Sequence, residues 1–151
     1  MSSVEVFVKP AQDFPELNLT EARTLSRMYG GNAERISNGE LVFEAPIDKA
    51  LRLLSRMCGS KEAGILLGEY GKQDIPRGVR LAASIIGPMR YKVVVDQGQR
   101  DLIKEVVQNM EGTVDVRSPD AILRVTKNGG SYTLKLIFIQ LEQCSANYSR
   151  R

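Results

Sequence analysis

An Asn-Gly pair at positions 38 and 39 constrains the fold of this chain more than any other local feature. It separates two short runs that suit β-strands, AERIS before it and ELVFEA after it. A type I′ turn needs positive φ at both central residues, and Asn-Gly is a pair that adopts it readily. The pair therefore predicts a β-hairpin in the first half of the chain.

The segments around this hairpin predict two helices and two more strands. Residues 4–8 alternate and are β-branched, which favours a strand. A helix follows, with Asp13 as its expected N-cap and an apolar stripe expected to face the core, made of Leu17, Ala22, Leu25 and Met28. Residues 47–57 repeat the helical spacing, and 63–70 form an apolar strand. The resulting order, β-α-β-β-α-β, is that of a ferredoxin-like domain.

The second half starts after a polar stretch with Gly and Pro, residues 71–78, that we expect to be a linker. The apolar pattern then predicts a helix over 79–86, a strand over 91–95 and a helix over 102–110. Asn128-Gly129-Gly130 predicts a second hairpin, whose long second strand we expect to be central and buried. We therefore expect two domains, 1–72 and 73–151, in an α+β protein.

The sequence lacks the residues that several common kinds of catalytic and metal site require. The chain has no histidine, and its two cysteines, Cys58 and Cys144, lie far apart, which excludes most zinc sites and the usual catalytic triads. We expect both cysteines to be buried apolar residues. No glycine-rich phosphate loop is visible, so we expect neither a cofactor nor a metal. With no apolar run long enough to cross a membrane and no secretory signal, we expect a cytoplasmic protein.

Asp115 and Asp120 are the nearest candidates for acid–base work, but a structural role is favoured. Pro119 keeps Ser118 out of the α region, and Asp120 is expected to accept local backbone N–H groups in an Asx turn.

The positive charge lies in the second half. Residues 1–72 hold 9 Lys+Arg and 10 Asp+Glu, for a net −1, whereas 73–151 hold 12 and 8, for a net +4. Phosphate binding requires several cations on one face of the protein. Arg90, Lys92 and Arg100 flank one strand and the start of the next helix, so we expect them to lie near one another. The candidate RNA-binding residues are Arg77, Arg80, Arg90, Lys92, Arg100, Lys104, Arg117, Lys127, Arg150 and Arg151.

The segment TVDVRSPDAILRVTKNGGSYTLKLIF resembles the core of a THUMP domain. The shared features are the Val114-Asp115-Val116 step, the Pro119-Asp120 pair, the strand that ends at Val125, and the hairpin with Tyr132. The first half, with FPELNLTEARTL, GELVFEAP, DKALRLLSRM and AGILLGE, resembles the N-terminal ferredoxin-like domain of archaeal tRNA guanosine N2-methyltransferases.

This resemblance implies a ferredoxin-like domain followed by a THUMP-like domain, which together grip the acceptor end of tRNA. The family's methyltransferase domain, with its cofactor loop, would follow and is absent from these 151 residues. We therefore expect a non-catalytic module that presents tRNA to a separately encoded methyltransferase. The alternatives are an accessory component of an RNA particle such as the ribosome, and the RNA-binding fragment of a longer tRNA methyltransferase.

Overall fold

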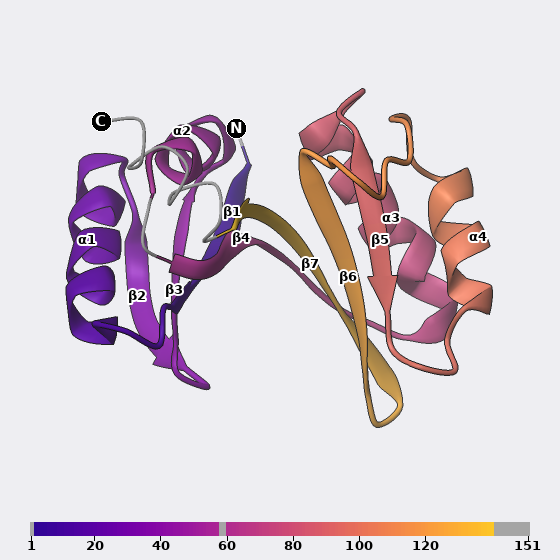
Figure 1. Cartoon of the computed structure of the whole chain (residues 1–151), viewed down its shortest axis with the longest axis horizontal. Coiled ribbons are helices and arrows are strands. Elements are labelled where there is room, and N and C mark those ends of the chain that lie inside the picture. Colours follow the sequence, from indigo (N-terminus) through magenta and orange to yellow (C-terminus); the bar gives the residue numbers. More distant parts are fainter. Residues whose placement is uncertain (1, 58–59, 141–151) are drawn as a thin grey trace. The chain divides into compact units, whose positions relative to one another are not determined.

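The computed structural model describes residues 2–57 and 60–140 (Figure 1). Within these residues seven strands and four α-helices form a mixed α+β fold, the class that the sequence predicts. In chain order the elements are β1 Ser3–Pro10, α1 Pro15–Met28, β2 Asn32–Ser37, β3 Glu40–Pro46, α2 Ile47–Arg56, β4 Ser60–Tyr70, the 3-10 turn η1 Lys72–Asp74, α3 Ile75–Ile86, β5 Tyr91–Val95, α4 Asp101–Gln108, β6 Ala121–Asn128 and β7 Ser131–Gln140.

The chain forms two compact units. Among the described residues, the first comprises 2–57, 60–65 and 138–140, and the second comprises Leu66–Ile137. The strands β4 and β7 each contribute residues to both units. The expected division into two domains, 1–72 and 73–151, stays a prediction.

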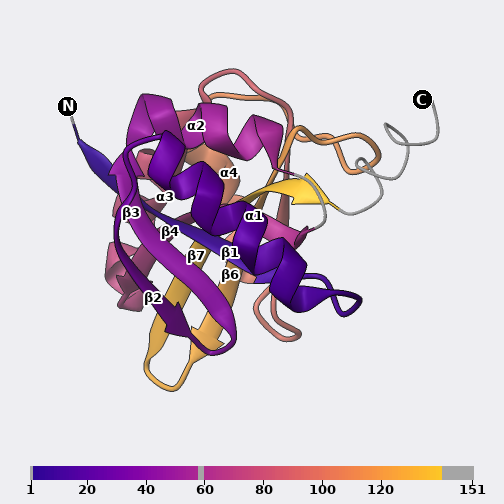
Figure 2. The same cartoon turned by 90° about the vertical axis from the view of Figure 1, so that its left-hand side faces the viewer.

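The first unit has the predicted order β-α-β-β-α-β. Its strands lie in the order β2-β3-β1-β4, and β3 pairs antiparallel with both β1 and β2. Asn38 and Gly39 have φ of 53° and 77°, so the hairpin turn has the positive φ values that a type I′ turn needs. Both α1 and α2 contact β1 and β3, and α1 lies in front of β1 in Figure 2. This is the ferredoxin-like arrangement.

The expected apolar stripe of α1 is confirmed only in part: Ala22 is buried, but other members are not. Leu17 and Met28 are 71% and 65% exposed, whereas the buried residues are Asn18, Ala22 and Ser26. The expected N-cap is wrong, because Phe14 occupies that position with φ 57° and no side-chain cap. A small buried face brings α1 close to the sheet: a Cβ at Gly31 would meet both the Ser26 side chain and Phe43.

The second unit has the strand order β4-β7-β6-β5. The strands β5 and β6 are parallel, while β6 and β7 form the antiparallel hairpin that the Asn128-Gly129 pair predicts. Only Gly129 of the two loop glycines has positive φ, 62°, which is typical of a type II′ turn. The strand β7 is central, as expected, but its burial alternates up to Leu136, so only one of its faces is fully buried there.

Residues 71–78 do not form the expected linker. They contain η1 and the first turn of α3, where Ile75 and Gly78 are buried. Proline is compatible with the first helical turn because no intrahelical partner exists for its missing N–H, so Pro76 does not interrupt α3. No helix in the described ranges is both long and apolar enough to cross a membrane.

The helices of this unit cover one face of its sheet. A Cβ added at Gly78 of α3 would lie 2.9 Å from Cδ2 of Leu134, so the side chain of Leu134 faces α3. Leu134 pairs with Val125, and both are buried, as is Leu123. Because side chains alternate along a strand, Arg124 and Lys135 lie on the opposite face of the sheet.

Candidate nucleic-acid interface

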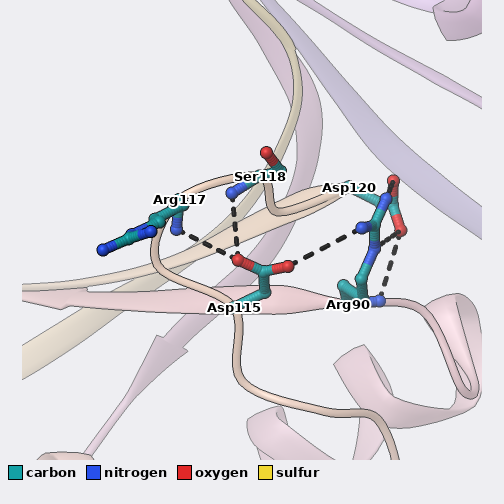
Figure 3. Close-up of polar contacts among 5 residues, drawn as sticks. All are labelled: Arg90, Asp115, Arg117, Ser118 and Asp120. Atoms are coloured by element: carbon teal, nitrogen blue, oxygen red, sulfur yellow. Dashed lines mark hydrogen bonds and ion pairs between the residues drawn. The ribbon is translucent and has the colours of Figure 1, made fainter.

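Arg90, one of the predicted RNA-binding residues, is held by two carboxylates just before β5 (Figure 3). Its Nε and Nη2 donate to the two oxygens of Asp120 at 3.3 Å each, and its backbone N–H donates to Asp120 Oδ2 at 3.3 Å. Its Nη1 lies 3.7 Å from Asp115 Oδ2. A cation with this many local partners is poorly placed to bind phosphate.

The pKa values of Arg90 and Asp120 are also consistent with a strong local contact. The hydrogen bond from Arg90 lowers the pKa of Asp120, and the same bond raises the pKa of Arg90. Both groups are therefore charged at neutral pH. Because the ion pair between Arg90 and Asp120 is exposed, its contribution to stability is small. Its main consequence is to hold the segment before β5 next to the segment before β6.

Asp115 makes the Asx turn that the sequence assigned to Asp120. Its Oδ1 accepts the backbone N–H groups of Arg117 and Ser118, each at 3.0 Å. The expected role of Asp120 is therefore wrong in detail, because Asp120 bonds Arg90 across the chain instead of its own neighbours. The guanidinium of Arg117 points away from both carboxylates in Figure 3, so Arg117 contributes only its backbone to this cluster.

The structure brings together only two of the three residues expected to form a group, Arg90, Lys92 and Arg100. Arg90 precedes β5 and Arg100 follows it, and a strand of five residues spans about 16 Å. Lys92 and Arg100 do lie together: both line a groove of about 560 Å³ between β5 and α4. Neither has an ion-pair partner among the described residues.

The exposed face of α3 carries a second group of cations. Arg77 and Arg80 are exposed and one helical turn apart, and Lys72 is exposed in the preceding turn η1. The Arg77 Cζ lies 5.7 Å from the centroid of the Tyr70 ring, and the Tyr70 hydroxyl donates to the Leu67 carbonyl at 2.8 Å. In the described part of the chain no carboxylate pairs with these three cations.

The other predicted residues are spread over the second unit. Lys104 is exposed on α4, one turn beyond Arg100. Lys127 is exposed at the end of β6, and its backbone N–H donates to Asp96 Oδ2 at 2.7 Å. Arg150 and Arg151 lie outside the described residues, as do Cys58 and Cys144.

Three cations were missed by the sequence reasoning. Lys72 was placed in a linker, and Arg124 and Lys135 lie in strands read as apolar. Arg124 and Lys135 pair directly across β6 and β7. The sequence does contain a signal for this pair. Arg124 lies four residues before Asn128 and Lys135 four residues after Ser131, so a two-residue turn between Asn128 and Ser131 places them opposite each other.

The charge of the second unit supports an anionic partner. Leu66–Ile137 contains eleven Lys+Arg and eight Asp+Glu, for a net +3, which equals the net charge of the whole chain. Three of the eight carboxylates, those of Asp96, Asp115 and Asp120, are already bonded within the unit. Among the described residues, no three Cys, Asp or Glu side chains converge as a metal site would require.

The fold and the charge together describe a mixed α+β protein whose second unit carries the net positive charge. Solved structures share its fold, among them PH1313 from Pyrococcus horikoshii Ot3, with a TM-score of 0.55 and 14% identity over 88% of this chain and 53% of that one. A 4-thiouridine synthetase in complex with RNA and ATP matches with a TM-score of 0.55 and 13% identity, over 89% of this chain and 41% of that one.

A predicted N6-adenine-specific DNA methylase from Listeria monocytogenes str. 4b F2365 also matches, with a TM-score of 0.55 and 14% identity over 91% of this chain and 40% of that one. These likenesses support the THUMP-like fold implied by the sequence. No family model and no curated protein matches the sequence. The chain spans about two-fifths to one-half of the length of these solved proteins.

Proposed function

We propose that this chain binds structured RNA, specifically tRNA, and presents it to a catalytic domain or subunit. The observation that carries the proposal is the exposed surface of η1 and α3, where Lys72, Arg77 and Arg80 have no carboxylate partners among the described residues. Phosphate contacts dominate RNA affinity, and arginine is well suited to them because its guanidinium donates in a planar fork.

The surroundings of these cations favour a phosphate ligand. They lie in and just before the first two turns of α3, where the unpaired backbone N–H groups and the helix dipole add positive potential. The Tyr70 ring lies beside Arg77 and adds an aromatic surface of the kind that bases stack on. The likeness to a synthetase solved with RNA supports the same class of ligand.

The catalytic partner is proposed from the kinds of protein that share the fold. The solved proteins that share the fold include a synthetase and a predicted methylase, and this chain spans about two-fifths of each. A methyltransferase, encoded separately or continuous with this chain, is the partner that the resemblance to the archaeal tRNA guanosine N2-methyltransferases favours. An accessory role in an RNA particle such as the ribosome is the second candidate.

Affinity purification of the tagged full chain in physiological salt tests the proposal. We expect tRNA and a methyltransferase among the bound molecules, and we expect the purified chain alone to transfer no labelled methyl group to tRNA. Co-sedimentation with ribosomes without bound tRNA would favour the second candidate. Methyl transfer by the chain alone would contradict the non-catalytic role.

A further inference from the structure

The strand β5 is the last in the sheet order of the second unit, so one of its edges faces no further strand. The backbone hydrogen bonds of Arg90 and Tyr91 determine which backbone groups of β5 point outward. The Arg90 carbonyl accepts from Asp120 and Ala121, toward β6, whereas Tyr91 bonds Thr113 and Asp115 on the other side. Since backbone groups alternate along a strand, the N–H and C=O groups of Val93 and Val95 point outward, away from β6.

The only segment that pairs with this edge within the described ranges ends after one residue. Val114 forms an isolated parallel bridge with Tyr91. The next residue, Asp115, accepts the N–H groups of Arg117 and Ser118 and so turns the chain away. The open part of the edge therefore begins at Val93.

The groove between β5 and α4 is lined by Lys92–Val95, which include the residues of this open edge. Its lining combines apolar residues, Val93, Val94, Val95 and Ile103, with the cations Lys92 and Arg100. Its one carboxylate, Asp96, already accepts the Lys127 N–H at 2.7 Å. The groove therefore offers an apolar surface, two cations, and two outward N–H and C=O pairs about 6.6 Å apart.

We propose that this edge docks an extended, acidic segment of a partner protein, which adds a strand beside β5. A peptide backbone matches both the N–H and the C=O groups of Val93 and Val95, and acidic side chains match Lys92 and Arg100. A nucleic-acid strand fits less well, because its phosphates only accept hydrogen bonds and would be repelled by the outward carbonyls. A second copy of β5 fits less well, because it would bring Lys92 and Arg100 near their own copies.

The test uses the full chain and a synthetic nine-residue peptide that alternates Glu with Val or Thr. A control peptide has Gln in place of every Glu. We expect the acidic peptide to slow amide hydrogen exchange at Val93 and Val95 at least fivefold. The amides of Lys92 and Val94, which point toward β6, keep their rates. The Gln peptide is expected to bind at least tenfold more weakly.

Two double variants separate this site from the proposed RNA face. Lys92→Gln/Arg100→Gln should weaken binding of the acidic peptide at least tenfold, whereas Arg77→Gln/Arg80→Gln should weaken tRNA binding and leave the affinity for the peptide within twofold. The two proposals thus fail independently. Unchanged exchange at Val93 and Val95 with peptide would overturn the docking site. So would protection by single-stranded RNA in place of peptide, or protection that rises with protein concentration alone.

Discussion

Asp120 holds Arg90 at three points, through the Nε, the Nη2 and the backbone N–H of the arginine, each at 3.3 Å. This contact joins the start of β5 to the start of β6, the two parallel neighbours of the second unit. It gives the Pro-Asp pair of the THUMP-like motif a structural role: the carboxylate fixes the segment that precedes β6.

This role predicts how Arg90 behaves when it is replaced. Arg90→Ala should lower the melting temperature slightly, since the pair is exposed, and should leave tRNA affinity within twofold. Circular dichroism and fluorescence anisotropy measure the two effects. Arg117→Ala is the matched control, because the Arg117 guanidinium points away from the cluster, and it should not change the melting temperature. A tenfold loss of tRNA affinity in Arg90→Ala alone would contradict the assignment.

The contact between Arg90 and Asp120 should also depend on pH. The pKa of Asp120 is lower in the folded chain than its ordinary value of 3.8, because the Arg90 side chain donates to it. Its contribution to stability is therefore present above pH 3.8 and is lost as the pH falls through the lowered value. The nitrogen chemical shift of the Arg90 amide should report this step. Asp120→Asn should remove it, and a midpoint above 3.8 would contradict the contact.

Gly78 tests the packing of α3 on the sheet. A Cβ at this position would lie 2.7 Å from Tyr70 and 2.9 Å from Leu134. Overpacking costs about 1–3 kcal/mol, which outweighs the roughly 1 kcal/mol that alanine gains over glycine in a helix. Gly78→Ala should therefore lower the free energy of unfolding. Gly71→Ala is the control, since a Cβ there meets open space, and equal stability of the two variants in urea would contradict the packing.

Two leucines test the core of the second unit. Leu123 and Leu134 are 0% exposed, and truncating a buried leucine costs about 2–5 kcal/mol. Leu123→Ala and Leu134→Ala should each lower the free energy of unfolding by that amount. Leu81→Ala is the matched control on α3, because Leu81 is 39% exposed and should cost less than about 1 kcal/mol. Unchanged melting of both core variants would mean that β6 and β7 do not form the core.

The sequence predicted the elements whose signals are local. The hairpin turns at Asn38-Gly39 and Gly129-Gly130 formed where expected, because asparagine and glycine adopt positive φ more readily than other residues. The face of α1 was missed because it depends on how closely the helix approaches the sheet. The small residues Ala22 and Ser26 set that distance, and an apolar pattern does not report it.

The candidate site was less predictable than the fold. Arg90 looks equivalent to Arg77 in the sequence, because each lies near a proline and an apolar element. The difference arises from Asp120, thirty residues further along the chain, which β-sheet pairing brings to Arg90. Charge patterns along a sequence locate cations, whereas the three-dimensional arrangement decides which of them already have anionic partners.

The salt dependence of tRNA binding shows most directly whether the exposed arginines of α3 bind RNA phosphates. Arg77→Ala/Arg80→Ala removes two exposed cations from α3, and Arg23→Ala/Arg27→Ala removes two exposed cations from α1 as a matched control. Each lost phosphate contact should make the slope of log affinity against log salt shallower by about 0.7–0.9. We predict a slope shallower by about 1.4–1.8 for the α3 variant and an unchanged slope for the α1 variant. A folded α3 variant with the slope and affinity of the unmodified chain would mean that Arg77 and Arg80 do not bind tRNA.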